Sequence, residues 1–105
     1  MPATRYEIPL PLKYNDGGSV ESEKLLQTKL DLVQKFGALT VDPYPLQGLW
    51  THRGTSYQDS LLRYIVDVEE DSAAVQAFFG EFKEILKSRF RQLDVWIVAY
   101  PIRVV

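Results

Sequence analysis

Apolar and polar side chains alternate along the first segment of the chain, up to the turn sequence Asn15-Asp16-Gly17-Gly18. A period of two predicts a β-strand with one apolar face. Pro9 and Pro11 lie on the other face and lack backbone donors, so we expect them at an edge or a frayed end of the sheet. The positions of the apolar face are Tyr6, Ile8, Leu10, Leu12 and Tyr14.

Two later segments repeat their apolar residues at the spacing of an α-helix. The first helix is predicted between Ser19, which can cap it, and Gly37, placed where a left-handed residue ends a helix. Its apolar positions are Leu25, Leu26, Leu30, Val33 and Phe36. The second helix begins at Asp71 or Ser72, and its phenylalanine-rich stripe indicates core packing rather than a cofactor site. That stripe is Val75, Phe78, Phe79, Phe82, Ile85, Leu86 and Phe90.

Three further strands are predicted from the rest of the pattern. Residues 48–52 and 57–69 resemble the arms of a hairpin, and Gly54-Thr55 between them predicts a two-residue type II′ turn. Residues 95–100 are apolar on both faces, which predicts a strand covered on both sides. The hairpin turn would pair Arg53 with Ser56, His52 with Tyr57, and Trp50 with Asp59.

The order strand, helix, strand, strand, helix, strand resembles the ferredoxin-like superfold. The resemblance implies an α+β βαββαβ protein with an antiparallel four-stranded sheet and two helices on one face. The length of 105 residues suits one domain, 1–105. Because this superfold hosts unrelated functions, the resemblance implies no activity.

Composition narrows the function classes. With 46% apolar and 25% charged residues, the chain has the composition of an ordinary globular domain. Its formal net charge of −2 disfavours nucleic acid and anionic membranes as partners. Without cysteine and with one histidine, we expect no metal and no cofactor. The polar start of the chain lacks the apolar core of a signal peptide, so we expect a cytoplasmic protein.

One face of the predicted sheet is left without helices. Alternate residues of the third strand, Leu62, Tyr64, Val66 and Val68, should face the helices, so their neighbours face the opposite side, here called the open face. The residues assigned to it are Arg5, Glu7, Trp50, His52, Tyr57, Asp59, Leu61, Arg63, Ile65, Asp67, Trp96, Val98, Tyr100, Ile102 and Val104.

Such an aromatic face favours a protein interface, and we expect an assembly domain that forms a homodimer through it. Arg63 between Glu7 and Asp67 would then be an ion network that sets the register. The alternative is a small-ligand site, in which Arg63 or Arg53 holds an anionic group and Trp50 and Trp96 stack on a ring. The predicted ligand or interface residues are Trp50, Arg63, Trp96 and Tyr100.

Catalysis without a cofactor is a third hypothesis. His52 and Asp59 would lie diagonally across the hairpin, with Tyr57 opposite His52, and histidine is a common general acid or base. A histidine beside an acid and a tyrosine is more often an ordinary surface group. Because the sequence lacks a nucleophile elbow and a phosphate-binding glycine loop, we favour binding over catalysis. The candidate catalytic residues are His52, Tyr57 and Asp59.

Overall fold

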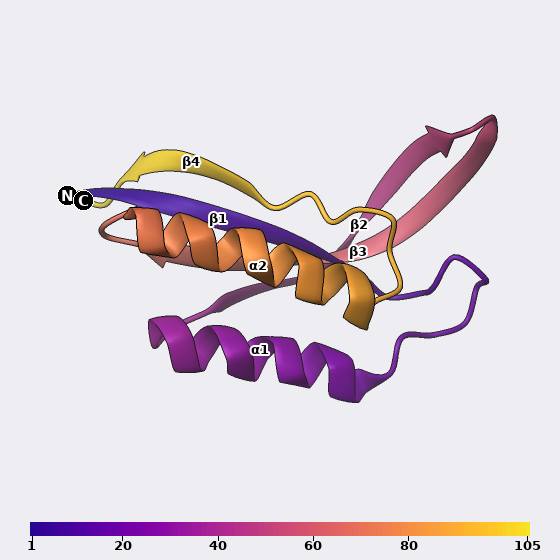
Figure 1. Ribbon diagram of the computed structural model, residues 1–105, viewed down its shortest axis with the longest axis horizontal. Coiled ribbons are helices and arrows are strands. Elements are labelled where there is room, and N and C mark those ends of the chain that lie inside the picture. Colours follow the sequence, from indigo (N-terminus) through magenta and orange to yellow (C-terminus); the bar gives the residue numbers. More distant parts are fainter.

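The predicted order of strands and helices is confirmed by a computed structural model, which describes residues 1–105. The sheet is antiparallel with the order β2-β3-β1-β4, and both helices lie on the same side of it (Figure 1). This is the ferredoxin-like α+β arrangement. The elements are β1 (Pro2–Pro11), α1 (Ser22–Phe36), β2 (Thr40–His52), β3 (Thr55–Val68), α2 (Ala73–Arg89) and β4 (Val98–Arg103).

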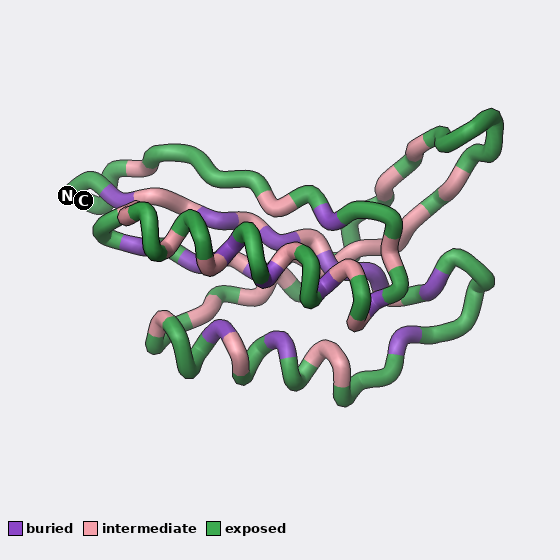
Figure 2. The backbone as a smooth tube through the Cα atoms, viewed as in Figure 1, coloured by how far each residue is buried: buried purple, intermediate pink, exposed green.

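The hydrophobic core lies between the helices and one face of the two central strands, β1 and β3 (Figure 2). As predicted, Tyr64, Val66 and Val68 of β3 are buried in it, and Leu62 packs against it. The hairpin formed by β2 and β3 extends away from the helices, so its outer part is exposed or only half-buried (Figures 1 and 2). The main core residues are Tyr6, Ile8, Leu10, Leu32, Tyr64, Val66, Phe79, Phe82, Leu86 and Phe90.

The prolines of β1 lie where the sheet loses a neighbour. Leu12 donates its N–H to the carbonyl oxygen of Ser60 in β3 at 2.9 Å. Because N–H groups alternate in direction along a strand, Leu10 and Ile8 also direct theirs toward β3. Pro9 and Pro11 are on the alternate positions, which face β4, and β4 pairs with β1 only as far as Glu7. The missing donors therefore cost no ladder hydrogen bond, and the prediction of a frayed edge is confirmed.

Of the two predicted ends of α1, the C-terminal one is confirmed and the N-terminal one is wrong. Gly37 ends the helix with φ of 81° and donates its N–H to Val33 at 2.7 Å, as expected for a left-handed C-terminal residue. The predicted cap at Ser19 is wrong. Ser19 instead forms an isolated β-bridge with Lys13, and the helix begins three residues later, with Glu21 at the N-cap position.

The predicted apolar stripe of α1 is partly wrong. Leu26, Leu30 and Val33 are exposed, whereas Thr28 and Leu32 are fully buried. The buried face of α1 is centred on those two residues, and Thr28 is buried there without an unsatisfied hydroxyl. Its hydroxyl donates to the carbonyl oxygen of Lys24 at 2.8 Å and accepts a hydrogen bond from Arg89 at 2.9 Å.

The second helix follows its prediction closely. The Ser72 hydroxyl accepts a hydrogen bond from the N–H of Val75 at 3.2 Å and caps the helix. Five of the predicted stripe positions pack in or against the core beside Phe90, but Ile85 is half-exposed on the outer side. No helix of this protein is long and apolar enough to cross a bilayer.

The hairpin turn is formed by Arg53 and Gly54, so the predicted Gly54-Thr55 turn and its three pairs are wrong. Both turn residues have positive φ, 50° and 78°, which is the type I′ geometry whose twist matches that of paired strands. Each residue of the predicted arm 48–52 therefore faces a β3 residue two positions earlier than predicted. Because the shift is even, every side chain stays on its predicted face. The observed pairs are Trp50 with Tyr57, Thr51 with Ser56, and His52 with Thr55.

Both edge strands differ from their predicted bounds. β2 begins at Thr40, eight residues before the predicted arm, and accommodates Pro43 and Pro45 in an irregularity between Asp42 and Leu46. An edge strand tolerates these prolines because one of its sides has no ladder to break. β4 begins at Val98 rather than at Val95 and is exposed on its open face, so the expected cover on both sides is wrong.

Candidate functional site

The open face divides into two regions with different chemistry. Near the middle of the sheet, charged side chains and a tyrosine from all four strands form an ion network. Toward the hairpin, aromatic and apolar side chains surround a pocket. The β-ladders place the residues predicted for the open face of β1, β2 and β3 on it, because residues that pair directly share a face.

The ion network is centred on Arg63. Its guanidinium group contacts Asp42 at 2.9 Å and Glu7 at 3.6 Å, and the hydroxyl of Tyr100 donates to Glu7 at 2.7 Å. The predicted contact of Arg63 with Asp67 is wrong, because Arg5 takes that carboxylate at 2.8 Å. Arg63 and Tyr100 are therefore both occupied by carboxylates of the same chain.

The network joins two arginines to three carboxylates, and both arginines are paired. The backbone N–H of Tyr44, followed by the guanidinium of Arg63, holds the pKa of Asp42 below its usual range. The carboxylate of Asp67 raises the pKa of Arg5. One buried atom, Nε of Arg63, has no hydrogen-bond partner. These contacts join the strands across the sheet without a free cationic group at their centre.

The hairpin pocket has a volume of about 640 Å³ and lies where β1 ends, between the half of the hairpin nearer its turn and the segment that leads into β4. It brings together four residues predicted from the sequence: Trp50, His52, Asp59 and Trp96. Tyr57, Arg63 and Tyr100 do not line it. The other lining residues are Pro9, Pro11, Gly48, Leu49, Leu61, Gln92, Leu93, Asp94 and Val95.

Trp50 is the best-anchored side chain of this pocket. Its ring stacks on Tyr57 with centroids 4.3 Å apart and an angle of 17° between the planes. Its indole N–H donates to a carboxylate oxygen of Asp59 at 2.6 Å. Because both contacts cross from β2 to β3, the hairpin fixes the position of the ring and of the carboxylate together.

The predicted arrangement of the catalytic candidates changes with the hairpin register. His52 pairs with Thr55, and Asp59 lies four residues further along β3, about 13 Å away along the strand. The carboxylate is held by the indole of Trp50 instead of orienting the imidazole. Tyr57 stacks against Trp50, so the three candidates do not form one hydrogen-bonded group.

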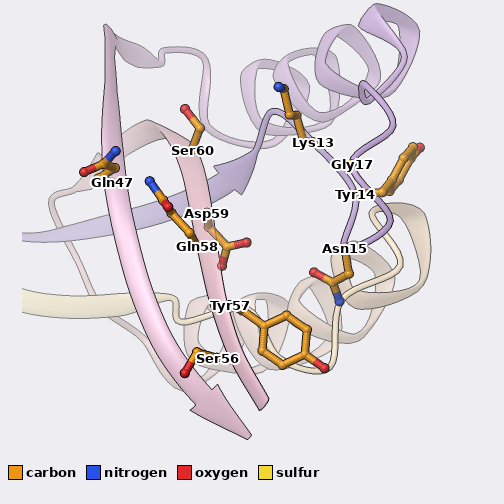
Figure 3. A pocket seen from close by; sticks show the side chains of 10 residues that line it. All are labelled: Lys13, Tyr14, Asn15, Gly17, Gln47, Ser56, Tyr57, Gln58, Asp59 and Ser60. Atoms are coloured by element: carbon orange, nitrogen blue, oxygen red, sulfur yellow. The ribbon is translucent and has the colours of Figure 1, made fainter.

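A second, polar pocket of about 450 Å³ lies beside the hairpin, between β3 and the turn that follows β1 (Figure 3). Tyr57, Asp59 and Ser60 line one side of it, and Lys13 and Asn15 belong to the turn on the other side. Asp59 lines both pockets. The structure contains no group of three or more histidine, cysteine, aspartate or glutamate side chains placed to hold a metal ion.

Sequence reasoning missed the part of the hairpin pocket that comes from outside the hairpin. Pro9 and Pro11 were assigned to a frayed edge, and residues 92–94 received no role. The positions of the two prolines on the open face could have indicated that they line this pocket. The path of residues 92–94 depends on where β4 begins, which the apolar run at 95–100 obscured.

No known family model matches the chain, and no curated protein matches its sequence. Solved structures with a similar fold include a phage SAM lyase in complex with S-methyl-5′-thioadenosine, 14% identical, with a TM-score of 0.70 over 97% of this chain and 90% of that one. They also include CutA1 from Oryza sativa, 12% identical, with a TM-score of 0.63 over 99% and 83% of the two chains. A divalent cation tolerance protein (CutA1) from Thermus thermophilus is 18% identical, with a TM-score of 0.63 over 97% and 85%. These likenesses show the fold alone.

Proposed function

We propose that this protein is an assembly domain that forms a homodimer through its open face. The observation that carries the proposal is the size of its surface. The chain exposes 6822 Å², whereas a folded monomer of 12.1 kDa exposes about 6,000 Å². The chain therefore leaves about 800 Å² more surface uncovered than a typical monomer of its mass.

The composition of the open face supports the same function. Val98 and Tyr100 of β4 are about two-fifths exposed, and Trp96 before them is 73% exposed. Leu46, on the same face of β2, is also exposed. Apolar and aromatic side chains that expose this much area are typical of interface cores, where their burial releases water.

The charges on the open face are compatible with burial in an interface. Arg63 and Arg5 each contact carboxylates of their own chain, so covering them would leave no isolated charge. In a twofold interface each contact between two different residues occurs twice, so the mixed-sign charges of this face allow arginines of one copy to face carboxylates of the other.

The proposal is tested by comparing Val98→Lys with Val33→Lys. Val98 lies on the open face opposite Glu7, and Val33 lies on the outer side of α1, with exposures of 41% and 43%. Light scattering after size exclusion should give twice 12.1 kDa for the wild type and for Val33→Lys. Val98→Lys should give the monomer mass, with an unchanged circular dichroism spectrum. A monomeric wild type at the highest attainable concentration, or a dimeric Val98→Lys, would overturn the proposal.

A second candidate function is the binding of a small molecule in the hairpin pocket. The observation that favours it is that this one cavity collects both tryptophans, the single histidine and Asp59. The structural neighbour in complex with S-methyl-5′-thioadenosine supports a ligand-binding use of this fold. Catalysis by His52, Tyr57 and Asp59 stays a prediction of the sequence.

A further inference from the structure

The walls of the hairpin pocket suit an organic ligand. Its volume of about 640 Å³ falls inside the range of about 300–1,000 Å³ that small-molecule sites occupy. Trp50 and Trp96 provide aromatic surface, and Pro9, Pro11 and Leu61 provide apolar surface. Trp50 is held in place by Tyr57 and Asp59, so one aromatic wall is already positioned before a ligand arrives.

The charge of the pocket selects the sign of the ligand. Its charged lining residues are Asp59 and Asp94, and no lysine or arginine lines it. Asp94 is neutralised by Lys83 at 3.0 Å. Asp59 forms no ion pair in this structure, and its hydrogen bond comes from the neutral indole of Trp50. A half-buried carboxylate with only a neutral partner attracts a cation and repels an anion.

We propose that the hairpin pocket binds a small organic cation, an ammonium group on an apolar or aromatic body. The cationic group lies beside the Asp59 carboxylate and over an indole face, where the ring quadrupole attracts positive charge. The apolar body contacts the prolines and Leu61. This inference deepens the second candidate function, and it replaces the anionic ligand that the sequence suggested for Arg63, whose guanidinium group is occupied by Asp42 and Glu7.

The test compares three probes of similar size and different charge: benzyltrimethylammonium, benzyl alcohol and phenylacetate. Binding is followed by calorimetry and by the NMR signals of the two indole N–H groups. We expect benzyltrimethylammonium to bind at least about tenfold more tightly than benzyl alcohol and to shift the Trp50 signal. Phenylacetate should bind weakest. Absence of binding by the cation, or equal binding of the three probes, would overturn the proposal.

Two substitutions locate the interaction. Asp59→Asn retains an oxygen that can accept the Trp50 hydrogen bond but removes the charge, so binding of the cation should weaken about tenfold. Asp16→Asn, in the turn after β1, changes the net charge equally outside this pocket and should leave binding unchanged. Equal binding by wild type and Asp59→Asn would contradict the site. Light scattering on the same samples reports the dimer separately, so a failure of assembly and a failure of ligand binding are distinguishable.

Discussion

Tyr64 lies at the centre of the core, where its side chain is fully buried and its hydroxyl donates a hydrogen bond to the carbonyl oxygen of Leu25 at 3.3 Å. Burial raises the pKa of Tyr64 to about 12. Tyr6 is a similar case, since burial and then its hydrogen bond to Asp71 raise the pKa of Tyr6 to about 12. Both phenols therefore stay protonated in the folded protein at a pH where an unfolded tyrosine begins to ionise.

A pH-dependent loss of stability follows from Tyr64. Its pKa is raised on folding, so its contribution is fully present below about pH 10, the unfolded value, and is lost as pH rises toward about 12. Between these pH values the free energy of unfolding of the wild type should fall more than that of Tyr64→Phe. The difference between the two falls should be on the order of 1–3 kcal/mol. Urea denaturation at neutral pH and at several alkaline pH values measures the difference.

Tyr44→Phe is the matched control for this experiment, because it removes the same hydroxyl from a residue that is 78% exposed. Its stability should follow the pH dependence of the wild type. Parallel alkaline profiles for wild type and Tyr64→Phe would show that burial of Tyr64 does not control the transition.

Asp59 and His52 illustrate what sequence reasoning can predict about single residues of the site. Their placement on the open face depended only on strand parity, and the ladders place them there. Their relation to each other depended on the turn. The positive φ of Arg53, which a non-glycine residue adopts at some cost, was not visible in the pattern and moved the two residues apart.

At the scale of elements, α1 shows why apolar identity is an incomplete guide to burial. Thr28 is buried and Leu30 is 46% exposed, although threonine is the more polar of the two. The decisive contact is the hydrogen bond from Arg89 of α2, which satisfies the buried hydroxyl and fixes how the two helices face each other. Arg89 also pairs with Asp31 at 2.9 Å.

Leucine-to-alanine substitutions test this orientation of α1. Leu32 is fully buried, so Leu32→Ala should lower the free energy of unfolding by about 2–4 kcal/mol. Leu30→Ala removes the same atoms from a half-exposed position and should cost less than about 1 kcal/mol. Urea denaturation compares the two variants. Similar losses at both positions would mean that Leu30 is buried in solution as well, by a partner or by a different rotation of the helix.

The whole molecule is longer than it is wide, with extents of 43 × 28 × 26 Å, because the hairpin projects beyond the helices (Figure 1). Its radius of gyration of 14.3 Å exceeds the value of about 13 Å expected for a compact domain of this length. A projecting hairpin and a bare sheet face both contribute exposed area. Shape and surface therefore support the proposed assembly at the largest scale.

If association stabilises the fold, the thermal midpoint should depend on protein concentration. Each tenfold increase should raise the midpoint of the wild type by about 3–5 °C, since mass action favours the state that binds a second copy. Val98→Lys, which disrupts the open face, should show a midpoint independent of concentration. Differential scanning calorimetry over a wide concentration range measures both, and a constant wild-type midpoint would argue against coupled folding and assembly.

The sequence by itself determined the element order, the fold class and the face on which the residues of the predicted strands lie. These features depend on periodicity and on local capping, as at Ser72 and Gly37, which neighbouring residues specify. Only the tertiary structure decided that Trp50 holds Asp59, that Arg5 takes Asp67, and that the segment before β4 closes the hairpin pocket. Those contacts join segments far apart along the chain, so they depend on turn geometry, strand register and helix rotation, none of which a periodic pattern specifies.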